Sequence, residues 1–207
     1  EEPNLLNLGE KRSARLCTYA SESAQEAAFG LAYLYSTAGD LADKDSLTKE
    51  YVHSYLVELI AHEVGHTLGF RHNFKASTIH TLEQINDREF TRLNGTVGTV
   101  MEYAPANISG DAAKQGEFYA STPGPYDNWI VEFAYSDFGA KTPEEEIDKV
   151  KAIASRSADP ELAYCTDYDV GGNKVDPMDN LFDLGNDPIR YCNHKVDLTR
   201  ELWLNTI

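Results

Sequence analysis

The sequence is poor in basic residues and has no long hydrophobic run. Its 207 residues include 18 Lys+Arg against 34 Asp+Glu, which gives a formal net charge of −16. An acidic surface with no basic cluster repels phosphate backbones, so nucleic-acid binding is not expected. No apolar stretch approaches the roughly 18 residues that indicate a membrane-spanning helix, so we expect no transmembrane segment.

Cysteine is scarce as well. The three cysteines, Cys17, Cys165 and Cys192, show no CxxC spacing and are too few for a disulfide scaffold. A zinc site built from cysteines is therefore not expected. In an exported protein one bridge could join Cys165 to Cys192, whereas three buried free thiols are the alternative, and the sequence does not choose between them.

The rest of the composition is that of a globular protein. Hydrophobic residues make up 42% and charged residues 25% of the chain, which excludes a disordered tail or a fibrous protein. The length predicts one domain, and the scarcity of alternating strand patterns predicts a mainly α fold. Helical patterns predict helices over residues 23–38, 46–69, 82–93, 126–138 and 142–153, a long loop over 159–187, and a final helix from about 197 to the end.

Local signals set several of these boundaries. Thr81 and Gln84 have the spacing of a capping box, and Pro143 follows a capping Thr142 at the start of another helix. Gly69 can adopt the backbone conformation that ends a helix. The helix over 46–69 is expected to have an apolar face of Val52, Tyr55, Leu56, Leu59 and Ile60.

The most informative stretch is an HExxHxxGxxH motif formed by His62, Glu63, His66, Gly69 and His72. Residues four apart on a helix lie one above the other, about 6 Å along the axis, so the first two imidazoles can bind one ion. A turn at the glycine can return the third histidine to the same ion. Three protein ligands leave one tetrahedral position for water, the arrangement of a catalytic zinc site.

Chance does not explain this motif. With this composition, HExxH alone arises in roughly 1 or 2 of 100 such chains, and adding Gly69 and His72 lowers that to a few in 100,000. The alternative is a buried helix whose histidines only satisfy hydrogen bonds, and the full constellation argues against it. His53, His80 and His194 have no partners at ligand spacing and are expected to be ordinary histidines.

With this motif the sequence resembles the metzincin clan of zinc metallopeptidases. Thr99 to Tyr103 looks like the Met-turn of that clan, in which Met101 would form an apolar floor under the metal without binding it. The resemblance implies one catalytic Zn²⁺ held by the three motif histidines and Glu63 as the general base. Tyr103 matches a position that, in some branches, stabilises the tetrahedral intermediate.

The resemblance can be narrowed to one family. It is closest to the bacterial Met-zincin domain of large exported zinc-dependent metalloproteases. This resemblance implies a protein or peptide substrate, an endopeptidase activity and export to the periplasm, the cell surface or the medium. The matching blocks are His62–Ser77, Met101–Tyr103, Gly124–Trp129, Tyr164–Asp169, Asp176-Pro177 and Phe182–Pro188.

One departure from the clan affects the domain prediction. In metzincins a mixed β-sheet precedes the zinc helix and binds the substrate backbone, but the 61 residues before His62 indicate only loop and helix. The chain also begins at Glu1 without an initiator Met. We therefore expect a single catalytic-domain fragment over 1–207, with the zinc motif in 1–75 and a helical lower subdomain in 76–207. The sheet would lie upstream in the parent, so cleavage by this chain is expected to be slow.

Two other functional classes stay open at this stage. The first is a zinc hydrolase that acts on non-peptide amides or esters, which nothing in the motif forbids. The second is a catalytically silent zinc-containing binding module, against which the intact Glu63 argues. A calcium site around Asp167, Asp169 and Asn173 was also considered, but position twelve of an EF-type loop would be Met178 rather than Glu.

Overall fold

The structure is a computed structural model that describes residues 17–39, 43–170 and 176–207. Within these ranges there are α- and 3₁₀-helices and no β-strand, so the predicted mainly α fold is confirmed. No helix in these ranges is both long and apolar enough to span a membrane. The α-helices are α2 (Tyr19–Thr37), α3 (Lys44–Thr67), α4 (Leu82–Ile85), α5 (Arg88–Asn94), α6 (Pro125–Tyr135), α7 (Pro143–Ala154) and α8 (Pro188–Thr206). The 3₁₀-helices are η1 (Ala76–Ile79), η2 (Ala112–Lys114), η3 (Ser155–Ala158) and η4 (Pro160–Leu162).

Most predicted helices are present, and two predictions need correction. The helix expected over 82–93 is split into α4 and α5, because Asp87 caps a new helix by accepting hydrogen bonds from the backbone N–H groups of Glu89 and Phe90. The last helix begins at Pro188 rather than near residue 197. Asp187 caps it by accepting from the Arg190 N–H, and proline at the first helical position needs no hydrogen-bond partner.

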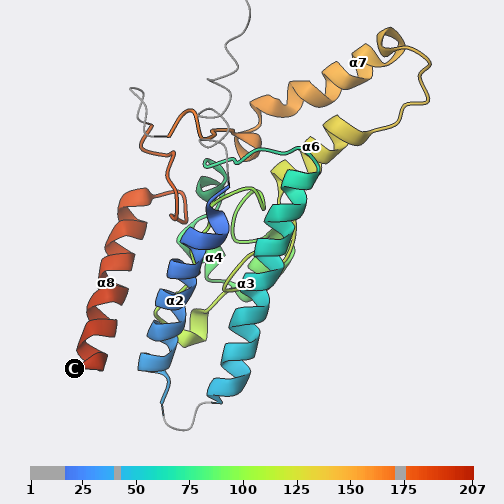
Figure 1. Cartoon of the computed structure of the whole chain (residues 1–207). Coiled ribbons are helices and arrows are strands. Elements are labelled where there is room, and N and C mark those ends of the chain that lie inside the picture. Colours follow the sequence, from blue (N-terminus) through green and yellow to red (C-terminus); the bar gives the residue numbers. More distant parts are fainter. Residues whose placement is uncertain (1–16, 40–42, 171–175) are drawn as a thin grey trace, which may run out of the picture.

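Three helices lie side by side, with α2 between α8 and α3 (Figure 1). The helices α2 and α8 run in the same direction and α3 runs in the opposite one (Figure 1). The pair α6 and α7 lies beyond the C-terminal end of α3, where the Tyr135 hydroxyl donates to the Leu68 carbonyl at 2.8 Å. The antiparallel arrangement brings the first residues of α2 next to the last turns of α3.

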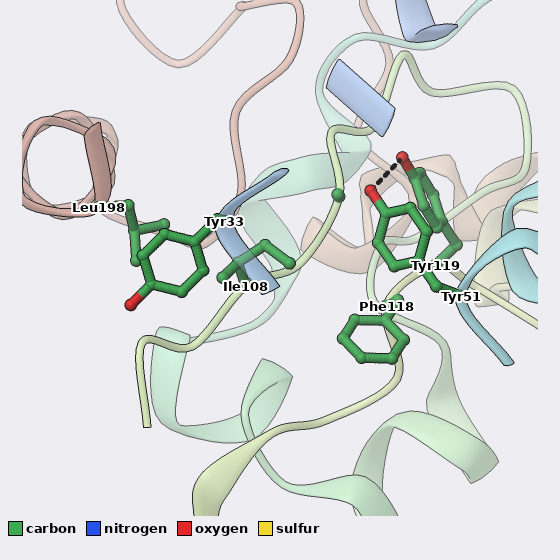
Figure 2. Packing of buried hydrophobic residues seen from close by; sticks show 7 residues of the cluster. Tyr33, Tyr51, Ile108, Phe118, Tyr119 and Leu198 are labelled. Carbon is green, nitrogen blue, oxygen red and sulfur yellow. Dashed lines mark hydrogen bonds between the residues drawn. The ribbon is translucent and has the colours of Figure 1, made fainter. Parts of the chain in front are cut away.

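An aromatic core holds this helical layer to the loops beneath it. Tyr33 of α2, Tyr51 of α3 and Leu198 of α8 pack with Phe118 and Tyr119 from the loop after η2 (Figure 2). The hydroxyls of Tyr51 and Tyr119 lie 3.4 Å apart, which gives these buried polar atoms a partner. The core therefore fixes the N-terminal half of α3, at Leu47, Tyr51 and Tyr55, against α2 and the loop.

The buried face of α3 differs from the predicted one. The helix buries Tyr51, Glu58, His62 and Gly65, with Tyr55 and Leu59 partly covered. Of the predicted apolar face, Val52, Leu56 and Ile60 are exposed instead, and Val64 and Leu68 extend this exposed stripe toward the end of α3. The apolar pattern alone was misleading, because this helix turns its polar residues Glu58 and His62 inward, where they find polar partners.

A buried carboxyl group ties the start of α2 to α3. The Tyr19 hydroxyl donates to Glu58 Oε2 at 3.0 Å, and both side chains are at most 1% exposed. Burial raises the pKa of Glu58 to about 8, well above its usual value near 4.5. The carboxyl group is therefore mostly protonated at neutral pH and can stay in the core without an ion pair.

We predict that Leu198→Ala lowers the free energy of unfolding by about 2–5 kcal/mol, because Leu198 is 5% exposed and its loss leaves a cavity against Tyr33. Leu204→Ala is the matched control, since Leu204 lies on the same helix and is 68% exposed. Urea unfolding of the two variants compares them directly. Equal losses of stability would show that α8 does not pack on α2 in solution.

We also predict a pH dependence that originates at Glu58. A carboxyl group whose pKa rises on folding stabilises the fold below its unfolded pKa and loses that stabilisation as the pH rises through the folded pKa. Between about pH 5 and pH 8, the free energy of unfolding of the wild type should therefore fall by up to about 1.4 kcal/mol per pH unit because of Glu58. Glu58→Gln should remove this contribution to the slope. Parallel stability curves for wild type and variant would contradict a raised pKa at this residue.

Candidate metal centre

Three imidazoles converge at the end of α3. His62 and His66 lie one helical turn apart, and Gly69, with a φ of 84°, reverses the chain after the helix. This reversal brings His72 back to the same point. The ring centroids of His62 and His66 lie 4.8 Å apart, and that of His72 lies 5.3 Å and 4.8 Å from them, respectively.

Each imidazole uses its Nδ1 atom in a hydrogen bond to an oxygen. His62 Nδ1 lies 2.7 Å from the Val100 carbonyl, and His66 Nδ1 lies 3.0 Å from the Phe70 carbonyl. His72 Nδ1 lies 2.7 Å from Asp167 Oδ1. Since these oxygens only accept, each Nδ1 carries a proton, which leaves Nε2 as the atom of each ring that can bind a metal ion.

The Nε2 atom of each ring lies on the side away from the oxygen that bonds Nδ1. His66 Nε2 and His72 Nε2 lie 3.1 Å apart, and burial lowers the pKa of His72 and lowers that of His62 to about 3. These two rings are therefore neutral near pH 7. Two imidazole nitrogens 3.1 Å apart can share a proton or bind one cation. The donor set therefore fits Zn²⁺, which accepts imidazole nitrogen in tetrahedral sites.

A second layer of contacts fixes the rings. Asp167 accepts the Nδ1 proton of His72, and the loop that carries it is held by the buried Asn73. The Asn73 side chain accepts from the Cys165 N–H at 3.1 Å and donates to the Ala163 carbonyl at 3.0 Å. A carboxylate on the second nitrogen of a ligating histidine fixes the ring and raises its basicity, so Asp167 suits an orienting role.

The turn predicted around Met101 lies directly beneath α3. Met101 is fully buried, and a Cβ atom added to Gly65 would overlap its Sδ atom. The turn is held by Asp127, which accepts from the Thr99 hydroxyl and from the Val100 N–H at 3.0 Å. Because the Val100 carbonyl orients His62, Asp127 acts on the metal centre through the turn.

Glu63 and Tyr103, the two predicted catalytic residues, differ in their surroundings. Glu63 is exposed and follows His62 in the chain. Tyr103 is 4% exposed, with its ring 4.7 Å from that of His72. Its hydroxyl accepts from the Thr18 N–H at 3.1 Å and lies 3.4 Å from Cys17 Sγ, so this hydroxyl is already engaged.

Cys17 also belongs to the cluster, although nothing in the sequence indicates it. Its Sγ atom lies 3.4 Å from His62 Nε2, and Sγ and one nitrogen from each of the three histidines all lie within 4.8 Å of one another. Within the described ranges this is the one group of three or more His, Cys, Asp or Glu residues suited to a metal ion. Forty-four residues separate Cys17 from His62, so no local spacing could reveal it.

The remaining cysteines and histidines lie away from the cluster. Cys165 is buried, Cys192 is exposed on α8, and both are free, so the bridge considered between them is not formed. All three thiols are free, as the alternative predicts, but only Cys165 is buried. Outside the cluster, His53 is exposed, His80 packs on Phe90 and His194 bonds the Ile108 carbonyl.

The contacts of Asp167 and Asp169 do not support a calcium site around Asp167, Asp169 and Asn173. Asp167 contacts His72, and Asp169 accepts from the Thr166 N–H at 3.0 Å, so neither carboxylate is directed at a shared ion. Asn173 lies outside the described residues. Asp167 instead contacts the histidine centre through His72, which the sequence did not indicate because the two residues lie 95 positions apart.

The three imidazoles come from α3 and the turn after it, and Glu63 directly follows the first of them in the chain. This arrangement is that of a zinc-metallopeptidase-like centre. Residues 44–207 match the Met-zincin family. This match covers most of the chain, so the chain belongs to the Met-zincin family, as its motifs indicate. No curated protein and no solved structure matches the chain.

We predict that Asp167→Ala weakens zinc binding by about 10- to 100-fold, since orienting partners of ligating histidines contribute that much. Asp169→Ala is the control, because its carboxylate lies in the same loop and bonds Thr166 rather than His72. Competition with a chromogenic zinc chelator measures both affinities. A similar loss in the two variants would assign the effect to the loop rather than to the contact with His72.

Proposed function

We propose that the chain is a zinc-dependent metalloendopeptidase domain. The observation that carries this proposal is the convergence of three imidazoles at the end of α3, with Glu63 directly after the first of them in the chain. Membership of the Met-zincin family supports it. His62, His66 and His72 would hold the ion, and Met101 would support their rings from below. Bound Zn²⁺ would supply Lewis acidity that polarises a scissile carbonyl and acidifies water.

The protein residues would supply the proton transfers. Glu63 would accept a proton from the attacking water and return it to the leaving amine, the two roles of a general acid–base group. The exposure of Glu63 supports this role, because an exposed carboxylate can reach a substrate. Tyr103 would donate a hydrogen bond to the developing oxyanion once its hydroxyl is released from Thr18 and Cys17.

The natural substrate would be a protein or peptide outside the cytoplasm. This part of the proposal rests on the resemblance to exported metalloproteases. Hydrolysis of a non-peptide amide or ester uses the same groups, and a paired screen of peptide and ester substrates separates the two activities. A silent zinc-containing module has no need of Glu63, whose carboxylate neither binds the cluster nor supports the fold from a buried position.

We predict that Glu63→Gln keeps its zinc and loses peptide turnover by about 10²- to 10⁴-fold, because it removes the base and no ligand. The assay uses a fluorogenic peptide at matched zinc occupancy, both in the chain as it stands and in a Cys17→Ala background. Glu50→Gln is the control, since Glu50 is an exposed carboxylate on α3 that bonds Arg88. Turnover that survives Glu63→Gln in both backgrounds would refute the proposed role.

A further inference from the structure

We propose that Cys17 is a fourth ligand of the metal ion, and that its thiolate closes the position in which water would otherwise bind. The inference deepens the proposed function, since it rests on the same histidine centre. It starts from the position of one sulfur atom, 3.4 Å from His62 Nε2 and within 4.8 Å of the nitrogens of His66 and His72.

The spacing matches a mixed tetrahedral site. With Zn–N distances of about 2.0–2.1 Å and a Zn–S distance of about 2.3 Å, tetrahedral angles place two nitrogens about 3.4 Å apart and a nitrogen and a sulfur about 3.6 Å apart. The observed separations are 3.1 Å between His66 Nε2 and His72 Nε2 and 3.4 Å between His62 Nε2 and Cys17 Sγ. All four ligand atoms lie within 4.8 Å of one another, so movements of about 1 Å would place them around one ion.

The location of Cys17 does not depend on the thiol itself. Tyr19, two residues later, is fully buried, with its ring 4.4 Å from that of His62 and 4.8 Å from that of Tyr103. The Thr18 N–H donates to the Tyr103 hydroxyl at 3.1 Å. Two anchors on the residues that follow therefore present the thiol to the histidine cluster, as positioned ligands require.

The chemistry of the centre favours a thiolate there. His62 is fully buried, and its Nε2 lone pair has the Cys17 sulfur as its neighbour. On metal binding the Cys17 S–H bond would break, its proton would pass to solvent, and the sulfur would bond the ion. The Tyr103 hydroxyl, 3.4 Å from Sγ, would then donate to the thiolate, which only accepts.

With Cys17 bound, the metal would have no open position for water. Zinc with four protein ligands is the arrangement of structural sites, whereas catalysis requires one open position. The same contact also occupies the Tyr103 hydroxyl that would stabilise an oxyanion. Cys17 and Thr18 would therefore occupy both the metal position and the donor, and hydrolysis requires Cys17 to leave the ion.

Cobalt substitution tests the assignment without any measurement of activity. Co²⁺ bound by the wild-type chain should show a thiolate-to-cobalt charge-transfer band in the near ultraviolet, together with the intense visible bands of four-coordinate cobalt. Cys17→Ala should lose the charge-transfer band and keep bound cobalt. Cys192→Ala, which removes an exposed cysteine from α8, should keep both features.

A small anion tests the closed position. Azide binds an open metal position, so it should shift the visible bands of cobalt-loaded Cys17→Ala and leave those of the wild type unchanged. The proposal is overturned if the wild type lacks the charge-transfer band, if Cys17→Ala retains it, or if azide shifts both spectra equally. His66→Ala distinguishes an error about Cys17 from an error about the histidine ligands. If the histidines bind the metal, this variant should lose the visible bands or alter them strongly, even where Cys17 is not a ligand.

Discussion

The rest of the site depends on one constraint, the orientation of three imidazoles by hydrogen bonds at Nδ1. Without those bonds the rings could rotate and the Nε2 lone pairs would not converge. The three acceptors come from different parts of the chain: the Phe70 carbonyl follows α3, the Val100 carbonyl lies in the turn before Met101, and the Asp167 carboxylate lies in the long loop. A metal centre made of a short motif therefore requires most of the fold.

Buried polar groups carry much of this organisation. Asp127 holds the turn that orients His62, and Asn73 holds the loop that orients His72. Glu102, buried and with its pKa raised by burial, accepts from the Ser77 N–H at 3.0 Å and so links that turn to the segment after the motif. Each of these groups has hydrogen-bond partners, which is what makes a polar interior stable and geometrically specific.

The sequence predicts the mainly α fold and the convergence of the three histidines, but not the contacts between distant segments. The histidine spacing and the glycine at position 69 depend on local helix geometry, so the convergence of His62, His66 and His72 could be predicted. Cys17 and Asp167 could not, because each meets the histidines through chain reversals that no local pattern encodes. The exposed face of α3 was mispredicted for a related reason: the buried Glu58 is neutral and bonded to Tyr19, a long-range contact that hydrophobic periodicity does not report. The division into parts at residue 75 and the sheet expected upstream stay predictions.

Cys17, the histidine motif of α3 and the long loop that carries Asp167 meet at the metal centre. X-ray absorption at the zinc edge of the zinc-loaded chain tests this most directly, because it counts the ligands and identifies them. The account predicts about one zinc per chain, with three imidazole nitrogens at about 2.0–2.1 Å and one sulfur at about 2.3 Å. Zinc surrounded by oxygen, without the multiple scattering of imidazole rings, would contradict the centre itself.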